Sequence, residues 1–214
     1  MSNFNPTHAH LAVDLFAALQ GAHRPGSLAH ICWEQDFGAA PVAIFLQGLP
    51  AAGKSTIVAR YFVGWHVIDS DVVKASHPDY DPKNPSPLHD WSKAIAEDMT
   101  AQALDAGRPH IVDGTGTDGD KLTARMNRAR GAGFVPVLLH VRCRLETSLR
   151  RNAARARVGP PAILVEKAGQ VLGAFEDVLP AADVVVVVHN DAHGLGSGLE
   201  LQVQVNRLWT GGVR

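Results

Sequence analysis

Residues 48–55 read Gly-Leu-Pro-Ala-Ala-Gly-Lys-Ser, which matches the pattern G-x-x-x-x-G-K-[ST] of a phosphate-binding loop. The apolar run before it predicts a β-strand over Pro41 to Gln47, and the residues after it predict a helix over Lys54 to Phe62. In that setting, successive backbone N–H groups and the helix N-terminus surround a phosphate. The stretch therefore indicates a nucleotide-binding α/β domain.

The residue types within this loop predict different roles. Lys54 is expected to bridge the β- and γ-phosphates, and Ser55 is expected to ligate Mg²⁺. ATP and Mg²⁺ are the expected cofactors. The rest of the nucleotide site is expected to come from the loop and the first helical turn, at Gly48, Pro50, Ala51, Ala52, Gly53 and Thr56.

Further apolar runs alternate with helical patterns along the chain. The runs predict strands over Trp65 to Asp69, His110 to Asp113, Phe134 to Val141 and Asp183 to His189. The predicted helices are His89 to Ala106, Lys121 to Gly131, Leu145 to Arg157, Ile163 to Val178 and Leu199 to Leu208. Val184 to Val188 is continuously apolar, as expected for a strand covered on both faces. We therefore predict a three-layer α/β fold, with a mainly parallel sheet of about five strands and helices on both faces.

The length and composition limit the number of domains and the kinds of partner that can be expected. A chain of 214 residues suits one α/β domain, expected over 41–214, with residues 1–40 as an N-terminal helical segment packed on it. The 20 basic and 21 acidic residues nearly cancel, so no overall field favours nucleic acid or an anionic membrane. No apolar run approaches the ~20 residues that span a bilayer, and two cysteines form no disulfide framework. A cytoplasmic protein is expected.

Two acids, Asp69 and Asp71, lie at the end of the second predicted strand. In extended backbone, residues two apart project to the same side, so both carboxylates are expected at the carboxyl edge of the sheet, where α/β proteins bind ligands. A carboxylate there can accept the proton of an acceptor hydroxyl as it attacks the γ-phosphate. The alternative is that Ser70 or Asp71 caps the following helix.

Asp113 ends the third predicted strand and is followed by Gly114-Thr115-Gly116. At this position Asp113 is expected to hold the Mg²⁺ shell through water, and Thr115 is expected to contact substrate or phosphate. A simple Asp-Gly turn is the alternative.

Six arginines lie close together in the sequence, at Arg142, Arg144, Arg150, Arg151, Arg155 and Arg157. Arg151 and Arg155 are four residues apart and would share a helix face. A guanidinium facing the site can stabilise the charge of phosphate transfer. We expect Arg151 first, then Arg157, to do so, from a lid over 145–162.

Taken together, these motifs resemble the zeta toxins, PezT-like P-loop kinases of bacterial toxin–antitoxin systems. The resemblance runs from the phosphate-binding loop to about Arg157 and includes 68–71 (Ile-Asp-Ser-Asp), Lys74, 77–81 (His-Pro-Asp-Tyr-Asp), Glu97 and 113–116 (Asp-Gly-Thr-Gly). The family usually has Glu-Gly-Thr-Gly at the last of these. Thr117 stands where many members carry an arginine that grips the substrate.

The resemblance implies a P-loop kinase fold and a kinase of the sugar 3′-hydroxyl of UDP-N-acetylglucosamine. It implies Asp71 as general base, Lys54 and Ser55 at the nucleotide and magnesium, Glu97 in holding the substrate, and Arg151 and Arg157 as charge-stabilising residues. Asp69, Asp113 and Thr115 complete the expected substrate site. An antitoxin protein is the implied partner.

Two other functions fit the same motifs. One is a kinase of nucleic acid or nucleoside hydroxyls, as in phage polynucleotide kinases and modified-base DNA kinases. The basic residues concentrate on one helix rather than along a stripe, and there are only two tyrosines and four tryptophans for stacking, so this function is less favoured. The other is a nucleotide-binding switch that transfers no phosphate.

Overall fold

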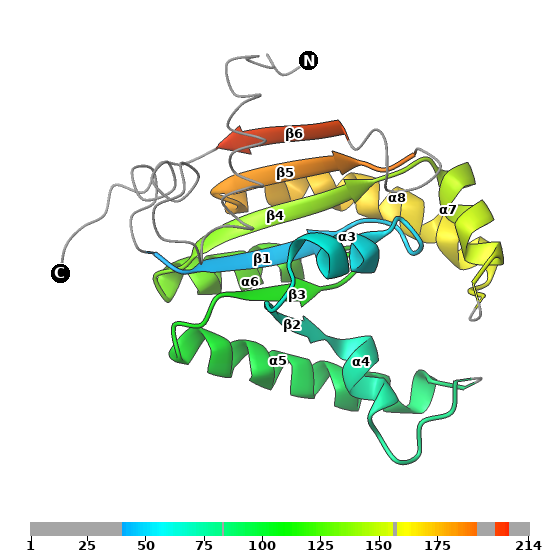
Figure 1. The fold of residues 1–214 in the computed structure, drawn as a ribbon, viewed down its shortest axis with the longest axis horizontal. Coiled ribbons are helices and arrows are strands. Elements are labelled where there is room, and N and C mark those ends of the chain that lie inside the picture. The colour runs from blue at the N-terminus through cyan, green and yellow to red at the C-terminus, as the bar shows by residue number, and fades with distance from the viewer. Residues whose placement is uncertain (1–39, 83, 156–157, 192–199, 206–214) are drawn as a thin grey trace.

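A computed structural model describes residues 40–82, 84–155 and 158–191, and the backbone of 200–205. Within these residues, six strands form one sheet in the order β2-β3-β1-β4-β5-β6 (Figure 1). The parallel strands are β1 (Val42–Gln47), β2 (His66–Asp69), β3 (His110–Asp113), β4 (Val135–Arg142) and β5 (Val184–His189). The predicted three-layer α/β fold is confirmed. The N-terminal segment predicted over 1–40 lies outside the described residues, apart from Ala40.

Helices cover both faces of the sheet (Figure 1). Helix α3 (Lys54–Tyr61) packs on one face, and α6 (Gly119–Gly131) and α8 (Pro161–Val178) pack on the other. Along the β2 edge, α5 (His89–Asp105) contacts α4 (Ser70–Ala75). The remaining elements are α7 (Leu145–Ala153) and two short 3-10 turns, η2 (Ser86–Leu88) and η3 (Leu179–Ala181).

Strand β1 shows how the sequence pattern builds the two layers. All six of its residues are buried. Ile44 packs in the cluster that contains Ile57 of α3, whereas the next residue, Phe45, packs in the cluster that contains Met126 of α6. Burial of each of these side chains contributes about 1.5–3 kcal/mol to folding. The central position of β1 places the phosphate-binding loop at the middle of the carboxyl edge.

The helix predicted over Leu145 to Arg157 is shorter than expected. It ends at Ala153, because the side chain of Asn152 bonds the backbone of Gly159 twice: Nδ2 donates to the Gly159 carbonyl at 2.8 Å, and Oδ1 accepts from its N–H at 3.0 Å. Arg155 therefore lies beyond the helix, and the expectation that it shares a helix face with Arg151 is wrong. Arg157 lies outside the described residues.

The helix predicted over Leu199 to Leu208 is also wrong. Residues Glu200–Val205 form strand β6, which pairs antiparallel with β5. Residues 201–205 read Leu-Gln-Val-Gln-Val, an alternation with the two-residue period of a strand. Pairing with β5 satisfies backbone groups that would otherwise be open at the sheet edge.

A buried polar network ties the end of β1 to the turn after β3. Gln47 Nε2 donates to the Gly116 carbonyl at 2.9 Å, and Gln47 Oε1 lies 2.9 Å from His140 Nδ1. Burial lowers the pKa of His140 to about 4, helped by the nearby charge of Arg142. His140 is therefore neutral, with its Nδ1 proton donated to Gln47.

We expect Gly116→Ala to destabilise the protein by about 1–3 kcal/mol. Gly116 has φ +63°, and an added Cβ would lie 2.6 Å from Gln47 Cγ. Urea unfolding would measure the loss. Gly131→Ala is the control because no atom lies within 4 Å of its added Cβ, and its effect should stay within about 1 kcal/mol. Equal stability of the two variants would contradict the network.

Candidate active site

The loop between β1 and α3 has the backbone of a phosphate cradle. Ala51 has φ +62° and Gly53 has φ +98°, so the chain makes left-handed turns before the helix starts. Among the described side chains none caps the N-terminus of α3, which leaves its first N–H groups facing the cleft. An anion placed there would also meet the positive end of the helix dipole.

Lys54 lies across this loop. Its Nζ donates to the carbonyls of Gly48 at 2.9 Å and Leu49 at 3.1 Å. Burial lowers the pKa of Lys54, while the negative charge of Asp113 acts in the opposite direction. The ammonium is therefore held at the mouth of the loop, in the place predicted from the motif.

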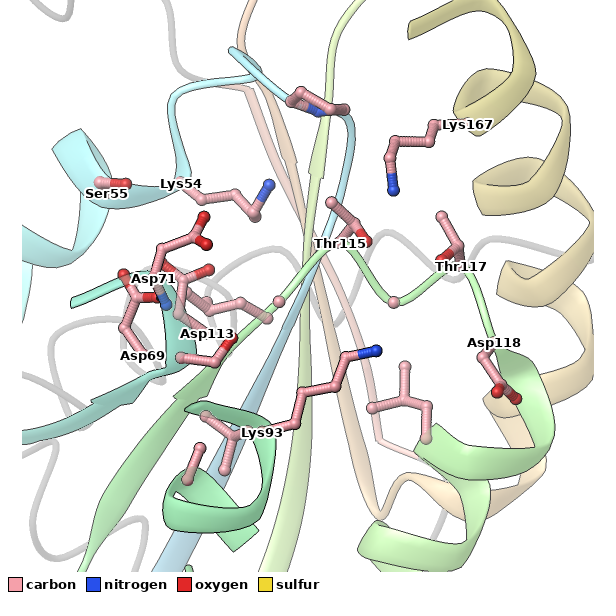
Figure 2. A pocket seen from close by; sticks show the side chains of 18 of the residues that line it. Lys54, Ser55, Asp69, Asp71, Lys93, Asp113, Thr115, Thr117, Asp118 and Lys167 are labelled. Atoms are coloured by element: carbon pink, nitrogen blue, oxygen red, sulfur yellow. The ribbon is translucent and has the colours of Figure 1, made fainter. Parts of the chain in front are cut away.

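Three carboxylates gather beside Lys54 (Figure 2). Asp69 and Asp113 end neighbouring strands and are register partners across the β2–β3 pair. Asp71 lies in the first turn of α4. The prediction that Asp69 and Asp71 share one extended strand is wrong, because α4 begins at Ser70 and Asp69 caps it, with Oδ1 accepting from the Asp71 N–H at 2.7 Å. The helical turn nevertheless keeps both acids in the cleft.

Asp113 is the most perturbed of these acids. Burial raises its pKa to about 6, Lys54 opposes that rise, and the charges of Asp69 and Asp71 add to it. In this environment the ionised form of a carboxylate is stabilised when a cation approaches. Asp113 therefore lies where an oxygen ligand for a divalent cation would be expected.

Asp71 is positioned by a buried lysine. Lys74 is only 4% exposed, and its Nζ lies 3.0 Å from Asp71 Oδ1 and 3.3 Å from His89 Nδ1. Burial and the charges of Lys93 and Lys74 lower the pKa of His89, which favours the neutral ring that can accept from Lys74. Lys74 thus fixes one Asp71 oxygen, and the largely exposed Asp71 side chain keeps the other open to the cleft.

These residues line one cleft of about 590 Å³ at the carboxyl edge of the sheet. Of the predicted site residues, those in the lining are Pro50, Ala51, Gly53, Lys54, Ser55, Asp69, Asp71, Asp113 and Thr115. Gly48, Ala52 and Thr56 do not line it. Sequence reasoning named Arg155 only as one of six clustered arginines and Thr117 only as a departure from the zeta-toxin pattern. It missed the cleft residues Lys93, Lys121, Arg125 and Lys167, whose only sequence signal is a positive charge on a helix, which is common on any surface.

Glu97 lies behind this lining rather than in it. Its Oε1 accepts from Arg125 Nε at 3.0 Å and lies 3.3 Å from Lys121 Nζ. Burial would raise the pKa of Glu97, but the hydrogen bonds and charges of Arg125 and Lys121 outweigh it and lower the pKa. The carboxylate holds two cations of the cleft wall, and its direct contact with substrate stays a prediction.

The arginines divide between the loop and the cleft. Arg151 Nη1 lies 3.4 Å from the carbonyl of Ala52, so it supports the phosphate-binding loop from outside the cleft. Arg155 lines the cleft, and its charge contributes to the lowered pKa of Lys54. Of the six clustered arginines, the described one that lines the cleft is therefore Arg155.

The donor set fits a magnesium ion. The Ser55 hydroxyl and the Asp113 carboxylate line the same cleft, and hydroxyl and carboxylate oxygens are the protein ligands that Mg²⁺ prefers. Within the described residues, no group of three or more His, Cys, Asp or Glu side chains could hold a metal. An ion here would thus need additional oxygen ligands from a bound phosphate or water.

The raised pKa of Asp113 predicts a pH-dependent stability. Between about pH 4 and pH 6 the folded protein holds a proton that the unfolded chain releases, so stability falls as pH rises, and the penalty is complete above about pH 6. Asp113→Asn cannot ionise. We compare the free energy of unfolding of this variant with that of wild type at two pH values. The difference should shift in favour of the variant by about 2–3 kcal/mol between pH 4 and pH 8. Denaturant unfolding at both pH values measures this, and an equal difference at both would contradict it.

Comparisons with known proteins agree with this geometry. A family model described as an AAA domain matches residues 44–173. A structure from the PezAT chromosomal toxin–antitoxin system of Streptococcus pneumoniae is similar, with a TM-score of 0.55 and 16% identity over 88% of this chain and 80% of that chain. Comparison with curated proteins gave no match.

Two further solved structures share the fold. The native AvrRxo1-ORF1:-ORF2 complex has a TM-score of 0.61 and 17% identity over 95% of this chain and 71% of that chain. Shikimate kinase from Bacteroides thetaiotaomicron has a TM-score of 0.50 and 16% identity over 73% of this chain and 89% of that chain. In the described part of the chain, no helix has the length and apolar character to cross a membrane. The family match extends from β1 into α8 and contains the whole phosphate-binding loop, and the chain therefore belongs to the AAA-domain family of P-loop proteins.

Proposed function

We propose that this protein is an ATP-dependent kinase that transfers the γ-phosphate to a hydroxyl of a small molecule. The observation that carries the proposal is the position of Asp71, which lies in the same cleft as Lys54 and keeps its side chain exposed. A nucleotide-binding switch needs the loop, its lysine and one carboxylate for Mg²⁺, a role that Asp113 can fill, but it has no use for a second, exposed carboxylate that a buried lysine holds in place.

The loop and Lys54 bind the nucleotide in this proposal. The N–H groups at the start of α3 donate to the phosphates, and Lys54 moves its hydrogen bonds from the carbonyls of Gly48 and Leu49 to phosphate oxygens. Ser55 and Asp113 would hold Mg²⁺, which neutralises charge on the β- and γ-phosphates. Binding of this cation would stabilise ionised Asp113, because the positive charge offsets the cost of burying the carboxylate.

Asp71 acts as the general base. The acceptor oxygen attacks the γ-phosphorus and forms the new P–O bond, its proton passes to Asp71, and the bond from the γ-phosphorus to the β–γ bridging oxygen breaks to release ADP. Lys74 keeps Asp71 in one orientation during this step. Arg155 stabilises the charge on the transferred group. In this proposal the lid is the stretch 145–162 expected from the sequence. Arg151 acts through the loop backbone, and Arg157 stays a sequence-based prediction.

The finer proposal is that the acceptor is a nucleotide sugar such as UDP-N-acetylglucosamine, that the enzyme acts in the cytoplasm, and that an antitoxin protein controls it. The resemblance of residues 68–81 and 113–116 to zeta toxins supports it. The fold shared with a protein of the PezAT toxin–antitoxin system supports it further. In this proposal Asp69, Glu97 and Thr115 help to place the sugar.

We expect label from γ-labelled ATP to pass to UDP-N-acetylglucosamine in the presence of Mg²⁺. Parallel reactions contain nucleosides, 5′-hydroxyl DNA and modified-base DNA, and chromatography identifies the labelled product. Label on DNA, weakening as salt rises, would instead establish the nucleic-acid kinase. Tight ATP binding without label on any acceptor would establish the switch and refute the kinase.

We expect Asp71→Asn to lower kcat by about 10²–10⁴-fold, since the amide cannot accept the acceptor proton. Its affinity for ATP, measured by calorimetry, should stay within about threefold of wild type, because Asp71 contacts the acceptor rather than the nucleotide. Asp105→Asn is the matched control: Asp105 is an exposed aspartate at the end of α5, away from the cleft, and its loss should leave kcat unchanged. Full activity of Asp71→Asn would exclude it as the base.

A further inference from the structure

The charges that line the cleft fall into two groups. Near Lys54 lie the three carboxylates at Asp69, Asp71 and Asp113. On the other side of the cleft, Lys93 and Lys167 extend into the space beside Thr115 and Thr117 (Figure 2). The carboxylate of Asp118 also lines this side, and its Oδ1 accepts from the backbone N–H of Lys121. The steps assigned above to Lys54, Asp71 and Asp113 leave this second group without a role.

Lys93 and Lys167 come from opposite walls. Lys93 is on α5, at the β2 edge of the sheet, and Lys167 is on α8, on the face covered by α6. Among the described residues, neither ammonium forms an ion pair or hydrogen bond with another side chain or backbone group. Lys93 is exposed and Lys167 is half-buried. An anion between the two ammonium groups would be attracted to both charges.

The neighbouring cations differ, because they already have a partner. Glu97 contacts both Lys121 and Arg125. The planar guanidinium of Arg125, the kind of group best suited to a carboxylate ligand, is thereby occupied by the protein's own carboxylate. Arg155, the other guanidinium in the lining, is assigned above to the transferred phosphate. On this side of the cleft the donors left open are the two ammonium groups and the threonine hydroxyls, which approach from different directions. Such a set suits a tetrahedral phosphate, whose oxygens can accept from several sides.

We propose that Lys93 and Lys167 form a clamp for a phosphate or diphosphate group that the acceptor already carries, so that its hydroxyl reaches Asp71. The clamp rests on the proposed kinase function and adds to it the residues that hold the acceptor's own phosphate, such as the diphosphate of a nucleotide sugar. It is separate from the nucleotide's phosphates, which lie at the loop and Lys54. Glu97 is a positioning residue here, since it holds Lys121 and Arg125 in the wall between the two lysines' helices.

The clamp can be tested by binding alone. The phosphate-binding loop is first filled with a saturating non-hydrolysable ATP analogue and Mg²⁺, and inorganic pyrophosphate is then titrated by calorimetry. Wild type should bind pyrophosphate, more weakly as salt rises, and Lys93→Met/Lys167→Met should weaken this binding at least ~10-fold. The affinity for the ATP analogue should be unchanged. Arg128→Met/Arg150→Met removes the same charge from exposed positions outside the cleft and should bind pyrophosphate like wild type.

Two other results of this titration would overturn the proposal. Equal pyrophosphate affinity in wild type and the lysine variant overturns the clamp, whether or not the enzyme is active. Tighter binding of malonate than of pyrophosphate, lost in the same variant, overturns the assignment to phosphate in favour of a carboxylate acceptor. Because no transfer is measured, failure of the kinase proposal would appear separately, as absence of label in the acceptor assay.

Discussion

The close approach of the phosphate-binding loop to the ends of β4 and β5 is the constraint on which the site depends. A Cβ at Gly48 would clash with the carbonyl of Val141, and a Cβ at Gly53 would clash with Asn190 Nδ2. The same Asn190 amide donates to the Ala52 carbonyl at 2.8 Å, and Ser148 Oγ donates to the Pro50 carbonyl at 2.6 Å. The loop is thus fixed by β5 and α7 before any phosphate arrives, which lowers the entropy cost of binding.

Burial sets the electrostatics of this fixed loop. It lowers the pKa of Lys54 and raises that of Asp113, so each group is disfavoured in its charged form and is partly supported by the other. A triphosphate with a divalent cation supplies a counter-charge to both. The charges across the cleft extend the same logic: three carboxylates lie beside the loop, and the ammonium groups of Lys93 and Lys167 lie at the far side, where Asp118, which caps α6, also lines the cleft. A ligand that spans the cleft is therefore oriented by charge as well as by shape.

Much of the fold could be predicted because it depends on local patterns. The apolar runs from Val42 to Val188 identified the five parallel strands, and residues 48–55 identified the loop by a motif whose residue types have direct physical reasons. The two errors have different origins. Asn152 ends α7 by bonding Gly159, seven residues on, a tertiary contact that no local pattern shows. Residues 201–205 do carry the alternation of a strand, which pairs with the edge of β5, so there the helix prediction misread the local pattern.

The sequence by itself determined the phosphate-binding loop, Lys54 and Ser55 within it, and the acids at the ends of β2 and β3, because each is set by a neighbour in the chain. Only the tertiary structure decided what those groups meet. It set Lys74 against His89, placed Glu97 against Arg125, and brought Lys93 and Lys167 from α5 and α8 to one cleft. Such pairings join residues distant in sequence, and their charge is as common on a solvated surface as in a site, so no local pattern marks them.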